Sequence, residues 1–136
     1  MTKYKLKKGW HRIGDPCYII RDEWDKILEE TNCFNKHMGG KFTIEDAKKN
    51  KHDIVVFPTH GDGGHIGNDG FEYGVDSGTL AIIPHSYQFV TEGICIGVLQ
   101  MSLRCCNVRR YEKDFYCSQS KSHITFGTLK IKKLWR

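Results

Sequence analysis

Short apolar runs, each closed by a turn signal, are the feature of this sequence that most restricts its fold. Residues 54–57 and 79–83 are rich in β-branched side chains and are too short for an ordinary helix. Such runs stop at residues that favour turns, as at positions 14–16 and 76–78. Many short strands at this spacing predict a mainly β fold of the α+β type, either a rolled antiparallel sheet or a small β-barrel or sandwich.

One segment has the periodicity of a helix instead. Within residues 21–31, Trp24, Ile27 and Leu28 recur at the i, i+3, i+4 spacing of a single helix face. Asp22 precedes them and is a suitable N-cap. We therefore expect one helix in the N-terminal half of the chain, packed on one side of the sheet.

The chain has no linker, repeat or low-complexity tract, so we expect residues 1–136 to form a single domain. Residues 59–70 are rich in glycine and predict a loop rather than a regular element. Residues 76–78, which lie between two apolar runs, are typical of a hairpin turn. No apolar run is long enough to span a membrane, and the basic N-terminus lacks the pattern of a signal peptide.

These features predict an intracellular protein of the cytoplasm. In that compartment, the six cysteines at positions 17, 33, 95, 105, 106 and 117 are expected to be free thiols. No Cys-x2-Cys pair is present, so we expect neither a structural zinc site nor another metal or cofactor.

The net charge of +5 comes from basic residues that concentrate at residues 3–12, 48–51, 104–110 and 130–136. A balance of this kind tolerates anionic ligands and attracts polyanions weakly. Aromatic and basic residues alternate around Trp10, which leaves nucleic acid as a partner that we consider but do not favour.

Three polar bends, around positions 15, 62 and 76, are candidates for one shared site at the end of the sheet. Glycine amides in the second bend can approach a phosphate closely, while carboxylates in the other two can accept hydrogen bonds from a sugar or base. Each bend also has a simpler interpretation, in which the carboxylate bonds only to neighbouring turn amides. The candidate ligand-binding residues are Arg12, Asp15, Tyr18, His60, Asp62, Gly63, Gly64, His65, Asp76 and Ser77.

Residues 14–18 read Gly-Asp-Pro-Cys-Tyr and residues 74–79 read Gly-Val-Asp-Ser-Gly-Thr. Together with Trp24 and the Gly-Asp-Gly of residues 61–63, these motifs resemble a family of small proteins common in bacteriophage genomes. The resemblance covers roughly the first two thirds of the chain. It implies expression in the cytoplasm of an infected bacterium and supplies no activity of its own.

The sequence favours a non-catalytic phage accessory protein that binds a host molecule. In its most specific form, the protein sequesters a small anionic immune signal, such as a nucleotide, and so counters host defence. One alternative is direct inhibition of a host defence or metabolic enzyme through a protein interface. A second is a metal-dependent hydrolase or nuclease in which Asp15, His60, Asp62 and Asp76 surround a metal-bound water. We assign no catalytic residue, because no nucleophile–base pair or phosphate-loop signature is present.

Overall fold

A computed structural model of the chain describes residues 1–20, 22–87 and 106–133. Within these ranges it contains two helices, α1 (Pro16–Ile19) and α2 (Asp22–Glu30), and eleven strands. The strands are β1 (Tyr4–Leu6), β2 (Gly9–Gly14), β3 (Gly40–Glu45), β4 (Lys51–Pro58), β5 (Gly63–Ile66), β6 (Glu72–Val75), β7 (Thr79–Pro84), β8 (Asn107–Tyr111), β9 (Phe115–Gln119), β10 (His123–Phe126) and β11 (Leu129–Lys132).

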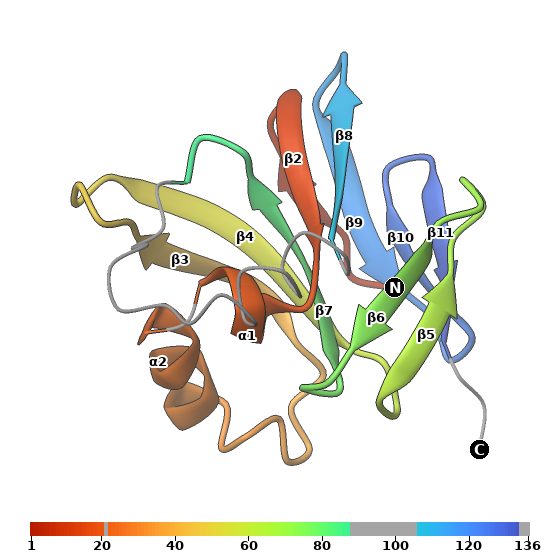
Figure 1. Ribbon diagram of the computed structural model, residues 1–136, viewed down its shortest axis with the longest axis horizontal. Coiled ribbons are helices and arrows are strands. Elements are labelled where there is room, and N and C mark those ends of the chain that lie inside the picture. Colours follow the sequence, from red (N-terminus) through yellow and green to blue (C-terminus); the bar gives the residue numbers. More distant parts are fainter. Residues whose placement is uncertain (21, 88–105, 134–136) are drawn as a thin grey trace.

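The described strands form three antiparallel sheets rather than a closed barrel. The first has the strand order β3-β4-β7-β2-β8, the second has the order β1-β9-β10-β11, and the third is the pair β5-β6. Figure 1 shows the five-stranded sheet at the left and centre and the four-stranded sheet at the right, with β5 and β6 beside β11. The prediction of a mainly β fold with antiparallel sheets is confirmed.

One apolar core lies between the sheets. It forms because successive strand residues point to opposite faces, so that alternate residues of each strand face the neighbouring sheet. Both ends of the chain contribute to it. Its fully buried members include Ile13, Val55, Phe57, Leu80 and Ile82 from the five-stranded sheet, Tyr73 from β6, and Ile124, Phe126, Leu129 and Ile131 from the four-stranded sheet.

A second core lies under the helices, on the other face of the five-stranded sheet. Trp24 and Ile27 of α2 are buried there, as the helical spacing of the sequence predicts. The helices cover Phe42, Ile44, Ile54, Val56, Ala81 and Ile83. Strand β7 is therefore covered on both faces, which explains why its sequence is apolar without alternation. Of the two helices, α1 was not expected from the sequence; it is a single turn with Pro16 at its start.

Two predictions about the middle of the chain are wrong. Residues 63–66 form strand β5, because pairing with β6 satisfies a backbone whose glycines alone would favour a loop. Residues 76–78 do not close a hairpin, since β6 pairs with β5 whereas β7 pairs with β4 and β2. They form a corner at which the chain passes from one sheet to another.

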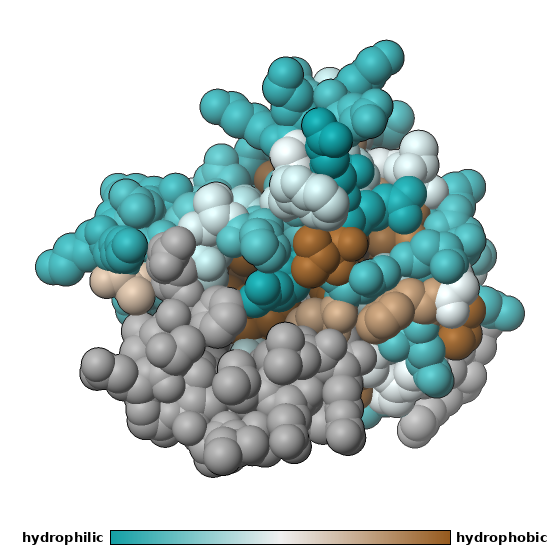
Figure 2. All heavy atoms as spheres, turned by 45° about the horizontal axis from the view of Figure 1, so that its top comes forward, coloured by the Kyte–Doolittle hydropathy of each residue, from teal (hydrophilic) through white to brown (hydrophobic). Residues whose placement is uncertain are grey.

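Two further corners connect the large sheets. The chain leaves the four-stranded sheet after β1 and enters the five-stranded sheet at β2, with only Lys7 and Lys8 between the strands. It makes the reverse passage between β8 and β9. Both corners lie at the upper end of Figure 1, and Figure 2 shows that this end is largely hydrophilic.

Neither described helix has the length and apolar character needed to cross a bilayer. The prediction of free thiols is confirmed for Cys17, Cys33 and Cys117, whereas Cys95 and Cys105 lie outside the described residues.

Candidate functional site

The first and third predicted bends meet at the carboxylate of Asp15, which is completely buried. Its Oδ1 accepts hydrogen bonds from the Cys17 amide at 2.9 Å and from the Ser77 hydroxyl at 2.7 Å. Its Oδ2 accepts hydrogen bonds from the amides of Asp76 at 2.6 Å and Ser77 at 2.9 Å. We call these four residues the Asp15 clamp. A carboxylate offers about four lone-pair sites for hydrogen bonds. The four donors of the clamp therefore occupy the hydrogen-bonding capacity of Asp15 within the protein.

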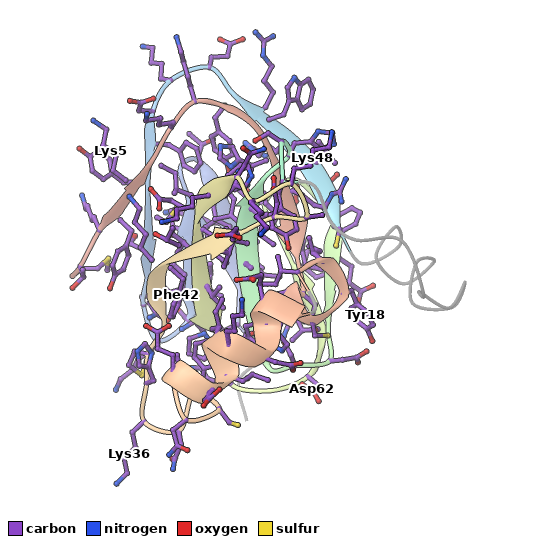
Figure 3. All side chains as sticks on the ribbon, turned by 90° about the vertical axis from the view of Figure 1, so that its left-hand side faces the viewer. Lys5, Tyr18, Lys36, Phe42, Lys48 and Asp62 are labelled. Carbon is purple, nitrogen blue, oxygen red and sulfur yellow. The ribbon has the colours of Figure 1, made fainter. Side chains whose placement is uncertain are left out.

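The remaining polar groups of these bends lie around the clamp. Tyr18 donates its hydroxyl hydrogen to Oδ2 of Asp76, and this bond, together with partial burial, raises the pKa of Tyr18. Asp62 is exposed, and its Oδ1 lies 3.8 Å from the position that a Cβ on Gly78 would occupy. Figure 3 shows Tyr18 and Asp62 on the same side of the molecule. The three bends thus come together, and a role for them in ligand binding stays a prediction.

The glycine-rich segment, residues 59–70, is held in place largely by hydrogen bonds of its backbone. Gly63 and Gly64 pair with Val75 and Gly74 in the β5-β6 sheet. His65 is buried, and its ring nitrogens lie 3.2 Å from the carbonyl oxygens of Lys132 and Gly61. Further along, the amides of residues 67, 68 and 70 donate to carbonyl oxygens. These contacts give the segment a structural function that its composition did not indicate.

The other predicted site residues lie around these elements. His60 is largely exposed, and the partial burial of its ring, followed by the charge of Lys133, lowers its pKa. Arg12 lies on β2 opposite Val108 and lines a small recess beside His85. Among the described residues, no group of three His, Cys, Asp or Glu side chains is placed to hold a metal ion.

A larger hollow lies on the opposite side of the molecule, where sequence reasoning did not place a site. It has a volume of about 840 Å³ and is lined by residues 5–11, 51–53 and 84–86 together with Lys41 and Asp114. These residues come from both large sheets and meet beside the corner between β1 and β2. In Figure 3, Lys5 marks this side and lies across the molecule from Tyr18. We call this hollow the basic groove.

Positive charge dominates the lining of the basic groove, which contains five lysines and two aspartates. Lys5 lies 3.9 Å from a carboxylate oxygen of Asp114, and Lys41 lies 3.6 Å from one of Asp53. Both ion pairs are partly exposed to solvent, so each aspartate reduces the attraction of its lysine for an anionic ligand only weakly. The side chains of the other three lysines, Lys7, Lys8 and Lys51, form no ion pair among the described residues. Two carboxylates nevertheless lie close by, because the Lys8 amide donates to Oδ1 of Asp114 at 2.9 Å and Lys51 is the register partner of Glu45.

No family model, curated protein or solved structure matches this chain. The basic groove and the Asp15 clamp are therefore the features of this chain from which a function can be inferred.

A buried histidine, His11, lines the basic groove and is only 3% exposed. Its Nε2 lies 2.9 Å from the Lys7 carbonyl oxygen, and because a carbonyl only accepts, Nε2 carries the proton. Its Nδ1 is therefore an acceptor, and it has no partner among the described residues. The ring packs edge-on against Tyr111 and Phe115. Burial lowers the pKa of His11, so the ring anchors the β1–β2 corner without adding charge.

This burial predicts a loss of stability in mild acid. Below about pH 6.5 the unfolded chain protonates His11 while the folded protein resists protonation, so the unfolded state binds more protons. The free energy of unfolding should then fall by up to about 1.4 kcal/mol per pH unit from this one group. Urea titrations of the wild type and of His11→Gln between pH 7.5 and about pH 5 would measure it. We expect a shallower decline in the variant; identical declines would contradict the assignment.

Proposed function

We propose that this protein is a non-catalytic binding protein for a phosphorylated anion, and that the basic groove takes up this ligand. The observation that carries the proposal is the presence of Lys7, Lys8 and Lys51, whose side chains form no ion pair among the described residues, in one groove of about 840 Å³. That volume is within the range of small-molecule sites. Ammonium groups attract phosphate as point charges, and they reach it on flexible stems.

The state of the predicted bends supports binding rather than catalysis. A general base or metal ligand needs a carboxylate with lone pairs directed at the reacting group. Asp15 instead directs its oxygens at four donors of the protein itself. Asp76 accepts the hydrogen of Tyr18. Two of the four residues that the hydrolase alternative requires, Asp15 and Asp76, are thus engaged in structural contacts.

The resemblance of residues 14–18 and 74–79 to proteins of phage genomes suggests a setting for this binding. In an infected bacterium, a protein that holds a nucleotide signal lowers its free concentration without any chemical step. The protein would then act stoichiometrically in the host cytoplasm, and its copy number would have to match that of the signal.

Titration of isotope-labelled protein with inorganic tripolyphosphate, followed by amide NMR shifts, tests the proposed location. We expect saturable shifts in residues 5–11, 51–53 and 85–86, and a phosphorus spectrum that shows intact tripolyphosphate after incubation. Shifts confined to residues 61–70 and 76–78 would instead favour the site predicted from sequence. The absence of saturable shifts, or cleavage of the probe, would contradict the proposal.

A further inference from the structure

The basic groove contains two carboxylates, those of Asp53 and Asp114, that phosphate binding does not use. One oxygen of each is held by the protein. Oδ1 of Asp53 accepts the Thr43 hydroxyl at 2.9 Å, and Oδ1 of Asp114 accepts the Lys8 amide at 2.9 Å. Each Oδ2 has only a loose ion pair with a lysine and accepts no hydrogen bond among the described residues. The two side chains are 51% and 46% exposed, so a ligand in the groove can reach them.

Each carboxylate lies beside an ammonium group that forms no ion pair. On β4, Lys51 and Asp53 are two residues apart, so their side chains leave the same face of the strand about 7 Å apart. That face is the one opposite the helices, because it also carries Val55 of the core between the sheets. At the corner between β1 and β2, the backbone of Lys8 bonds directly to Asp114. The groove therefore offers a cation for phosphate and an acceptor for another group of the same ligand, on both of its sides.

The group that suits these acceptors is a hydroxyl. A second phosphate would be repelled by the negative charge of either carboxylate. An ammonium group would meet Lys5 and Lys41, which already lie 3.9 Å and 3.6 Å from the two Oδ2 atoms and repel a further cation. A hydroxyl carries no charge, and its hydrogen bond to a carboxylate is about twice as strong as one between neutral groups.

The size of the groove agrees with an organic ligand, because about 840 Å³ is within the range of sites for such molecules. We infer that the ligand of the basic groove is a phosphorylated sugar or polyol. Its phosphates contact Lys7, Lys8 and Lys51, and its hydroxyl groups donate to Asp53 and Asp114. This inference rests on the proposed function and adds the class of ligand to it. The ribose of a nucleotide is one such sugar.

Two bisphosphates with carbon chains of equal length test this inference by calorimetric titration of the full chain. Fructose 1,6-bisphosphate carries hydroxyl groups, whereas hexane-1,6-diyl bisphosphate has the same terminal phosphates without them. We expect the wild type to prefer the fructose compound by about 100-fold. Asp53→Ala and Asp114→Ala should each reduce this preference by about 10-fold. Both variants should bind the hexane compound at least as tightly as the wild type, because a charge that repels phosphate is gone.

Asp62→Ala is the matched control. It removes the same charge from an exposed position, and Figure 3 shows Asp62 across the molecule from Lys5. Its preference should equal that of the wild type. Asp114→Asn keeps an acceptor for the Lys8 amide and serves if Asp114→Ala folds poorly; it should also lower the preference. Competition by ADP, compared with competition by fructose 1,6-bisphosphate, distinguishes a nucleotide from a phosphorylated sugar without a base.

The outcomes separate the two proposals. Equal affinities of the wild type for the two bisphosphates, or a preference that both groove variants retain in full, would overturn the sugar inference and leave anion binding in the groove intact. A preference that falls as far in Asp62→Ala as in the groove variants would also overturn it. Failure of the wild type to bind either bisphosphate or tripolyphosphate would overturn both proposals.

Discussion

Replacing Asp15 with alanine is expected to lower the free energy of unfolding by about 4 kcal/mol. The substitution removes one carboxylate and leaves the amides of Cys17, Asp76 and Ser77 without an acceptor, whereas the Ser77 hydroxyl can still donate to Oγ1 of Thr79, 2.6 Å away. Each buried donor without a partner costs about 1–3 kcal/mol, and few single changes remove so many partners at once. The loss also frees the start of α1 from its N-cap.

Urea denaturation of Asp15→Ala against Asp62→Ala measures this effect with a matched control. Asp62 lies beside the same corner but is exposed, so its replacement should change stability by no more than about 0.5 kcal/mol. Ser77→Ala removes one of the four donors and should fall between these two variants. If Asp15→Ala is no more destabilising than Asp62→Ala, the clamp does not hold the fold together.

The clamp shows how far sequence reasoning reaches at these motifs. An aspartate before a proline indicates a local turn, and Asp15 does accept a hydrogen bond from the amide two residues further on. The sequence contains no local signal that the same carboxylate also binds amides 61 and 62 residues away. Those partners depend on how the sheets pack, so spacing and propensity predict the turn but not the connection.

The glycine-rich segment illustrates the opposite error. Glycine weakens a strand and favours loops, so residues 63–66 have little β propensity of their own. They form β5 because β6 lies alongside and its residues Tyr73 and Val75 are anchored in the core between the sheets. Pairing with a partner that packing holds in place outweighs local propensity, which is a tertiary effect.

The basic groove was missed for a related reason. The clusters at residues 3–12 and 48–51 are visible in the sequence, where each suggests only a solvated surface. The fold brings β1 and the start of β4 to the same hollow and adds Lys41 from β3.

Charge reversal in the groove is the second change for which we expect a large effect. The triple variant Lys7→Glu, Lys8→Glu and Lys51→Glu should bind oligothymidylate at least about 100-fold more weakly than the wild type at low salt. It replaces three cations that would contact phosphate with three anions that repel it. The slope of log affinity against log salt should also become shallower by about 2, because three fewer counterions are released.

A second triple variant, Lys36→Glu, Lys121→Glu and Lys130→Glu, changes the net charge by the same amount. All three of its lysines are exposed and none of them lines the groove. The two variants have the same net charge, so the long-range attraction of a polyanion that depends on net charge falls by the same amount in both. A difference between them therefore reports the location of the charges.

Oligothymidylate affinity of the wild type and the two triple variants, measured from about 50 to about 200 mM KCl, tests the central claim most directly. Binding of a phosphorylated ligand in the basic groove predicts a steep salt dependence in the wild type, a similar one in the Lys36, Lys121 and Lys130 variant, and a weak, shallow one in the Lys7, Lys8 and Lys51 variant. Equal affinities and slopes for the two variants would contradict it.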